Sequence, residues 1–197
     1  SAARAGPRPK HHVGLTTTDG GGAYLTVRPA PTYTGAMRCD HFDAGTCQSC
    51  SLLPQPYERQ LAGKVEAVAA TLSPVPGAGD IAWLAPASSP EKGFRTSAKL
   101  VVGGTRRRPT LGILGPDRRG VDLPGCPIQH PAINRATPGL KRFIRSLDLT
   151  PYDVPTKRGE LKNILITVGE GERLMIRFVL RTHDRVSDIR SALPLLR

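Results

Sequence analysis

Four cysteines in one spacing pattern are the feature that most constrains how this chain can fold. Three of them, Cys39, Cys47 and Cys50, stand within twelve residues, and Cys126 follows much later, directly before a proline. A close Cys-x2-Cys pair with two further thiolates can form a four-sulfur cage for Zn²⁺ or for an iron–sulfur cluster. Disulfides and free thiols are the alternatives, although four-cysteine disulfide scaffolds are usually much shorter chains.

The spacing favours a [4Fe–4S] cluster, with zinc as the alternative. Structural zinc sites usually draw their ligands as two close pairs, whereas here Cys126 is solitary and seven residues separate Cys39 from the pair. A cysteine followed by proline is a familiar setting for an iron–sulfur ligand. His41 is a possible substitute ligand, but four cysteines already suffice. We expect the cluster to be a structural staple that joins the N-terminal loop to Cys126.

The charge balance predicts a polyanionic partner. Lys and Arg number 28 against 16 Asp and Glu, which gives a net charge of +12 and a pI near 10.2. No lysine-rich amphipathic stretch stands out, so nucleic acid is favoured over a membrane surface, and a basic but inert surface is the alternative. No apolar run is long enough to span a bilayer, and no secretory signal is present. We therefore expect a cytoplasmic protein with reduced thiols.

The composition divides the chain into three segments. Residues 1–36 are rich in Gly, Pro and Thr and poor in large apolar residues. Such a segment cannot offset the entropic cost of ordering, so a disordered extension is expected. The cysteine loop follows over residues 37–53, and residues 54–197 contain the periodic patterns of a folded domain. The apolar content of 39% is enough for a core in that domain.

The periodicity within residues 54–197 predicts an α+β fold with a mainly antiparallel sheet and flanking helices. A helix is expected from Pro54 and Pro56 to Leu72, and a second one with Thr137 as N-cap and Pro138 as its first residue. A short apolar strand over 81–85 would place Trp83 in the core. The remaining expected elements are strands at 94–102, 111–114, 164–168 and 173–181 and a helix at 184–192.

Seven short motifs, in this order, are shared with one known family. They are MRCDHFDAGTCQSC (37–50), YERQLAGK (57–64), GFRTSAK (93–99), GCPI (125–128), LTPYDV (149–154), KRGELK (157–162) and RFVLR (177–181). On these motifs the chain resembles the bacterial iron–sulfur RNA uracil-C5 methyltransferases, nearly end to end over residues 37–197. The extension over residues 1–36 has no counterpart in that family.

The resemblance implies a [4Fe–4S] cluster on Cys39, Cys47, Cys50 and Cys126, followed by a central RNA-binding domain. It also implies 23S rRNA as the partner and a monomer. Members of the family continue into a Rossmann-like catalytic domain, which binds S-adenosylmethionine and carries a cysteine nucleophile and a carboxylate base. This chain stops at Arg197, before those parts, and its four cysteines are assigned to the cluster. We therefore expect an incomplete RNA-binding domain, with the catalytic domain missing and no methylation by this chain alone.

The predicted RNA contacts combine basic turns with a few aromatic side chains. Arginines and lysines occur together at 106–108, 118–119 and 157–158, and Lys141, Arg142 and Arg145 lie on the outer face of the second predicted helix. Such groups suit phosphate binding with little sequence information. Base recognition needs stacking platforms, and Phe94 beside Arg95 and Lys99 is the first candidate. Tyr152 near Lys157 and Arg158 is the second. Core packing is the alternative for Phe94, and for any single arginine a merely solvated charge is the alternative.

Two other functions fit parts of the pattern. A stand-alone iron–sulfur or zinc module could bind RNA without catalysis, because both the cysteines and the basic residues would be used. An electron carrier would also use a cluster, but such proteins commonly dock through acidic surfaces, and the charge of +12 argues against this function.

Overall fold

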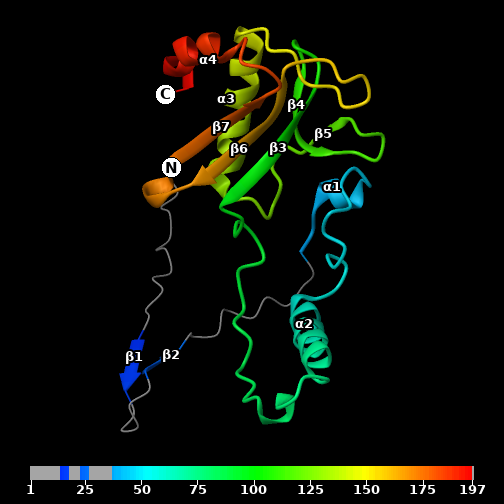
Figure 1. The fold of residues 1–197 in the computed structure, drawn as a ribbon, viewed down its shortest axis with the longest axis vertical. Coiled ribbons are helices and arrows are strands. Elements are labelled where there is room, and N and C mark those ends of the chain that lie inside the picture. The colour runs from blue at the N-terminus through cyan, green and yellow to red at the C-terminus, as the bar shows by residue number, and fades with distance from the viewer. Residues whose placement is uncertain (1–13, 18–22, 27–36, 197) are drawn as a thin grey trace, which may run out of the picture.

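A five-stranded antiparallel sheet forms the centre of the structure, a computed structural model that describes residues 14–17, 23–26 and 37–196 (Figure 1). The strands lie side by side in the order β5-β4-β3-β6-β7. Their bounds are β3 Ser97–Gly104, β4 Pro109–Leu114, β5 Gly120–Asp122, β6 Leu161–Val168 and β7 Leu174–Leu180. The predicted α+β class with an antiparallel sheet is confirmed.

Helices flank the sheet and precede it. The long helix α3 lies across one face of the sheet (Figure 1). The helices are α1 Asp40–Asp43, α2 Tyr57–Leu72, α3 Pro131–Ser146 and α4 Val186–Ala192, with short 3-10 turns at Ala78–Asp80, Glu170–Glu172 and Leu193–Leu196. Within the segment expected to be disordered, β1 (Gly14–Thr17) pairs with β2 (Ala23–Thr26). The rest of residues 1–36 lies outside the described residues.

The core lies between α3 and the inner face of the sheet. Ala98, Leu100 and Val102 alternate along β3 and are buried, as the sequence predicts. Opposite them, α3 contributes Ile133, Leu140, Phe143 and Ile144, and β6 contributes Leu161, Ile164 and Ile166. The rings of Phe143 and Phe178 lie 5.4 Å apart between centroids, which ties the helix to the edge strand β7.

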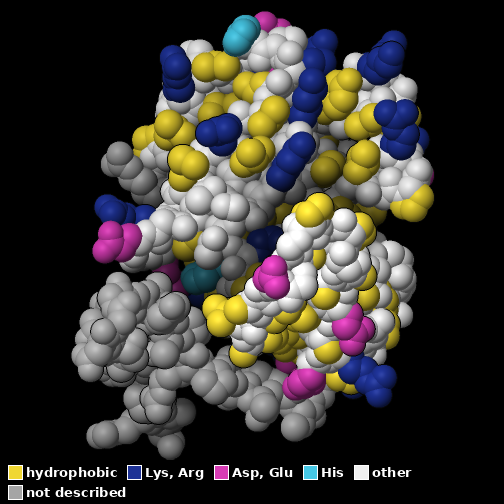
Figure 2. Space-filling view, turned by 60° about the horizontal axis from the view of Figure 1, so that its bottom comes forward, with side chains coloured by type: hydrophobic (Ala, Val, Ile, Leu, Met, Phe, Trp, Pro, Cys, Tyr) yellow, Lys and Arg dark blue, Asp and Glu magenta, His cyan; other side chains and the backbone are white. Residues whose placement is uncertain are grey.

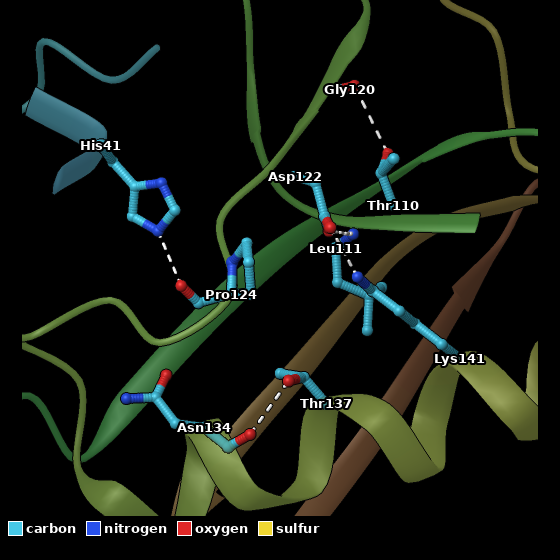
Figure 3. A network of polar contacts seen from close by, with 9 residues as sticks. All are labelled: His41, Thr110, Leu111, Gly120, Asp122, Pro124, Asn134, Thr137 and Lys141. Carbon is cyan, nitrogen blue, oxygen red and sulfur yellow. Dashed lines mark hydrogen bonds and ion pairs between the residues drawn. The ribbon is translucent and has the colours of Figure 1, made fainter. Parts of the chain in front are cut away.

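The predicted start of the second helix is wrong. Helix α3 begins at Pro131, capped by His130, whose Nδ1 accepts from the Ala132 amide at 3.2 Å. Pro138 therefore lies inside the helix, where its missing N–H leaves the Asn134 carbonyl without the usual partner. The Thr137 hydroxyl donates to that carbonyl at 2.9 Å (Figure 3), so Thr137 compensates for Pro138 instead of capping the helix.

Replacing Thr137 with valine is expected to destabilise the protein by about 1–3 kcal/mol, because the shape is kept while a buried carbonyl loses its donor. Thr137 is 7% exposed, so water does not readily replace the hydroxyl. In a Pro138→Ala background the new amide can bond to Asn134, and the same change at Thr137 should cost clearly less. Urea denaturation of the wild type, the two single variants and the double variant measures the coupling between Thr137 and Pro138. If Thr137→Val lowers the free energy of unfolding equally in both backgrounds, Thr137 does not compensate for Pro138.

The predicted strand over 81–85 is also wrong, and so is the core position of Trp83. Residues 81–90 form neither helix nor strand, and Trp83 is 49% exposed. The segment connects α2 to β3 and lies beside no other strand (Figure 1). An apolar run of this length becomes a strand only when a partner strand accepts its hydrogen bonds.

Candidate cluster and nucleic-acid site

The four cysteines are brought together by two loops that are distant in the sequence. Cys39, Cys47 and Cys50 surround the short helix α1, while Cys126 lies between β5 and α3. All four side chains line one small cavity. The other lining residues are Met37, His41, Phe42, Leu123, Pro127 and Ile128. The cavity wall is thus mostly apolar, with sulfur as its main polar element and no carboxylate.

Local hydrogen bonds coil the loop 37–53 so that its thiols converge. The Cys39 carbonyl accepts from the amides of Phe42 and Asp43, both at 2.9 Å, which closes the turn of α1. The Cys47 amide then donates to the His41 carbonyl at 3.0 Å. The loop ends at Leu53, whose side chain is buried and anchors it against the domain.

Hydrogen bonds to backbone carbonyls hold the Cys126 loop in place. The Asn134 amide group donates to the Cys126 carbonyl at 3.0 Å, and the Gln129 backbone amide donates to the same carbonyl at 3.1 Å. His41 Nε2 lies 2.7 Å from the Pro124 carbonyl (Figure 3), and since a carbonyl only accepts, Nε2 is the donor. His41 therefore joins the two cysteine-bearing loops directly, without acting as a ligand through Nε2.

The electrostatics of the thiols show that they form one group. Burial raises the pKa of the Cys126 thiol, and the charges of Cys39 and Cys47 raise it further, against two backbone amides that lower it. The pKa of Cys50 is also raised, first by burial and then by the other three thiols, while Arg95 lowers it. Ionising several of these thiols together is therefore unfavourable unless a cation is bound among them.

The four cysteine sulfurs are chemically suited to bind a metal centre as thiolates. Four sulfurs in an apolar wall are the ligands that iron–sulfur clusters and structural zinc sites use. As the side chains are placed, no group of three or more His, Cys, Asp or Glu among the described residues is arranged to hold a metal ion. The identity of the bound group is therefore taken up as a proposal below.

A pocket of about 360 Å³ adjoins the cysteines and contains two of the predicted RNA contacts. Phe94 and Arg95 line it together with Cys50. Phe94 is 47% exposed, so core packing does not account for it. The pocket is closed on the other side by Tyr57 of α2, whose hydroxyl accepts from the Ser89 amide at 2.9 Å. We call this pocket the Phe94 pocket.

The other predicted RNA contacts lie elsewhere. Lys99 is exposed on β3, on the face of the sheet that points away from α3. Lys157 and Arg158 are exposed in the loop before β6. That loop lies at the opposite end of β3 from Phe94, and eight strand residues separate the ends by roughly 25 Å. The five residues therefore do not form a single site.

The net positive charge belongs to the sheet domain. Residues 93–197 contain 20 Lys and Arg against 9 Asp and Glu, whereas residues 54–92, with α2, contain 3 against 4. Figure 2 shows the same division, with blue side chains spread over the upper body and apolar and acidic side chains on the lobe at lower right. Phosphate attraction is therefore concentrated on the sheet domain. None of the described helices has the length and apolar character needed to cross a membrane.

The sequence did not indicate several residues that shape this site. Asn134 supports Cys126 from eight residues away, and no motif signals that pairing. Glu91 places its Oε1 in a buried position without a hydrogen-bond partner among the residues that the structure describes. Glu91 lines the Phe94 pocket, where this oxygen could accept a hydrogen bond from a ligand. Only the nearby charged and aromatic residues hinted at a pocket here.

Comparison with known proteins identifies the class to which this fold and site belong. No family model matches the chain. It is 42% identical over 161 residues to relatives from Enterobacter sp. (strain 638) and Escherichia coli O139:H28, a match that covers 81% of this chain and 42% of each relative. By this similarity the chain belongs to the family of RNA uracil-C5 methyltransferases.

The two relatives are both named 23S rRNA (uracil(747)-C(5))-methyltransferase RlmC. The predicted resemblance to the RNA uracil-C5 methyltransferases is therefore confirmed. The chain spans about two-fifths of the length of these relatives. The fold is similar to the crystal structure of Pyrococcus abyssi tRNA (uracil-54, C5)-methyltransferase in complex with S-adenosyl-L-homocysteine. The TM-score is 0.58 at 19% identity, and the match covers 90% of this chain and 40% of that one.

Proposed function

We propose that this chain is the cluster-bearing, RNA-binding part of a 23S rRNA uracil-C5 methyltransferase. The observation that carries the proposal is the 42% identity over 161 residues to enzymes named for that reaction. Residues 37–53 form the cluster loop and residues 54–197 the central RNA-binding domain. The protein acts as a monomer in the cytoplasm, without contact to a membrane.

Methyl transfer from S-adenosylmethionine belongs to the whole protein in this proposal. All four cysteines of the chain line one cavity, so we assign none of them as a nucleophile. This chain by itself then binds RNA and does not methylate it. The alternative function is a stand-alone RNA-binding module. Under this alternative the chain is likewise expected to bind RNA.

The cysteine cavity holds a [4Fe–4S] cluster, which supplies a covalent link between the loop 37–53 and the sheet domain. Cys39, Cys47, Cys50 and Cys126 are its four ligands. Arg95 has a second role here, because its charge favours the thiolate of Cys50 and offsets the negative charge of four bound thiolates. His41 and Asn134 hold the two loops in register while the cluster is bound.

The sheet domain holds the RNA through phosphate contacts on its basic turns and through aromatic contacts to unstacked bases. Filter binding of a 23S rRNA hairpin to the whole chain across a salt series tests this function. The affinity should fall steeply as salt rises, with a slope set by the number of neutralised phosphates. Absence of binding at low salt, or a flat response to salt, would refute it.

Replacing Phe94 with leucine should weaken binding of the same hairpin about 5- to 100-fold, because a stacked base loses its platform. Stability should change little, since the ring is half exposed. The matched control is Trp83→Leu, which removes an equally exposed aromatic from the lobe without net positive charge. Equal losses for both variants would show that Phe94 is not a specific contact.

A further inference from the structure

We propose that a second pocket, at the far end of β3 from Phe94, binds one unstacked nucleotide of the RNA. Its base would lie against Tyr152 and its phosphate against Arg118 and Arg119. The proposal rests on the RNA-binding function proposed above and adds a defined subsite to it. We call this the Tyr152 pocket. The lining residues on which the proposal rests are Gly103, Arg118, Arg119, Gly120, Tyr152 and Asp153.

Glycines build the floor of the Tyr152 pocket by allowing the β4–β5 hairpin to fold back over β3. A Cβ atom on Gly103 would lie 2.6 Å from the Cα of Gly120, and one on Gly120 would lie 2.7 Å from the Cα of Gly103. Thr110, between them, donates to the Gly120 carbonyl at 3.4 Å (Figure 3). Because the two backbones touch, the floor carries no side chains and a ligand can reach the main chain.

On one wall of the Tyr152 pocket, the aromatic ring of Tyr152 is restrained by its neighbours. Its amide donates to the Leu161 carbonyl at 2.9 Å, which fixes the backbone against the start of β6. Lys162 Nζ lies 5.0 Å from the centroid of the Tyr152 ring, a cation–π contact that restrains the ring further. A ring fixed in this way loses little conformational entropy when a base stacks on it.

Arg118 and Arg119 supply the positive charge on the opposite wall. Their turn is closed by hydrogen bonds from Gly115 to the Arg119 carbonyl at 2.8 Å and from Arg118 to the Gly115 carbonyl at 2.9 Å. Both side chains are exposed, and neither forms an ion pair with a described acidic residue. The facing carboxylate of Asp153 is instead engaged by the amide and the hydroxyl of Thr156, at 3.1 and 2.6 Å.

The size and surroundings of the Tyr152 pocket favour a nucleotide within a chain of RNA. Its volume of about 300 Å³ is at the small end of ligand sites, which suits a single nucleotide better than a large cofactor. Its rim continues into the basic hairpin tip 106–108 through Thr105. The backbone of Asp153 forms an antiparallel β-bridge with that of Arg158, so the basic loop 157–158 lies beside the pocket. A polyanion that enters the pocket therefore has further positive charge on two sides.

Hairpin binding by the whole chain tests the proposal with two kinds of variant. Tyr152→Leu should weaken the affinity about 5- to 100-fold, while Tyr152→Phe, which keeps the ring, should bind within about twofold of the wild type. Arg118→Ala with Arg119→Ala should lower the slope of log affinity against log salt by about 1 to 2, because two phosphate contacts are lost. Circular dichroism and thermal melting confirm that each variant is folded.

The matched control is Arg177→Ala with Arg190→Ala, which removes the same charge from exposed positions on β7 and α4. The pocket is refuted if this control changes the salt slope as much as the Arg118 and Arg119 variant, since net charge would then suffice. It is also refuted if Tyr152→Leu binds as tightly as Tyr152→Phe. Failure of the wild-type chain to bind the hairpin would instead refute the RNA-binding function itself.

Discussion

Replacing Cys126 with serine is expected to abolish cluster binding and to release the loop 37–53 from the sheet domain. Of the four proposed ligands, Cys126 alone comes from the sheet domain, so its loss would remove the link that the proposed cluster provides. The contacts that remain include the His41 hydrogen bond to Pro124, the buried side chain of Leu53 and the apolar lining of the cavity. One exposed hydrogen bond contributes only about 1 kcal/mol.

Iron content and visible absorbance after anaerobic purification measure the first effect. The wild type should contain about four irons per chain, and the Cys126→Ser protein close to none. Limited proteolysis measures the second effect, as cleavage within residues 37–53 that is much faster than in the wild type. Ser49→Ala, in the same loop and exposed, is the control and should behave as the wild type.

Two outcomes would contradict the cluster. Full iron content in Cys126→Ser would show that Cys126 is not a ligand. A colourless wild type that contains one zinc per chain would replace the cluster with the alternative that the cysteine spacing left open.

The predictions from sequence succeeded where a pattern repeats along one element. Alternation in β3 and in β7 predicts which side chains point inward, because a strand residue that points inward forces every second neighbour inward. Leu174, Ile176, Phe178 and Leu180 alternate in this way, and in the structure they pack on the core. The four cysteines that the sequence groups together line one cavity.

The incorrect or missed sequence predictions have a common physical cause. In each case the local structure depends on contacts that the local sequence does not reveal. Thr137 and Pro138 look like a helix start, but a hydroxyl can also compensate for an interior proline, and the sequence does not distinguish the two uses. Trp83 looks like a core residue, yet no strand lies beside its segment. The Tyr152 pocket depends on Gly103 meeting Gly120, a contact that only the fold reveals.

The predicted RNA contacts lie at separate places in the structure. Phe94 and Arg95 stand at one end of β3, and Lys157 and Arg158 stand at the other. The arrangement suggests two aromatic pockets, about one strand length apart, on one basic domain. Two such contacts would hold an RNA loop in a defined orientation, which phosphate contacts alone do not provide.

Replacing Gly159 with alanine is expected to destabilise the sheet domain strongly. Gly159 has a φ of +97°, which side chains rarely tolerate, and its Cβ would lie 2.0 Å from the Pro151 carbonyl oxygen and 2.9 Å from the Cα of Tyr152. These are backbone atoms, so no rotation of a side chain relieves the contact. The left-handed backbone alone costs about 1–3 kcal/mol, and the steric conflict adds to it.

A backbone shift at Gly159 would also disturb the hydrogen bonds of the residues around it. The Gly159 carbonyl accepts from Arg181 at 2.9 Å, and the next residue, Glu160, is buried and accepts from the amide and hydroxyl of Thr182 at 2.7 and 2.9 Å. Moving the Pro151 backbone away would displace Tyr152. We therefore expect a loss of more than about 3 kcal/mol, a large part of the stability of an ordinary domain, together with weakened RNA binding.

Urea denaturation followed by circular dichroism measures the loss, and Gly63→Ala is the matched control. Gly63 lies within α2, and a Cβ there meets nothing within 4 Å. The same glycine-to-alanine change should therefore stabilise that helix by up to about 1 kcal/mol, because alanine is the better helix former. Opposite signs for one substitution at two positions would show that the cost at Gly159 comes from its backbone conformation and its contact with Pro151, and not from the added methyl group as such. A Gly159→Ala protein as stable as the wild type would mean that these two backbones are not in contact, and the Tyr152 pocket would then lose the wall on which its proposed function depends.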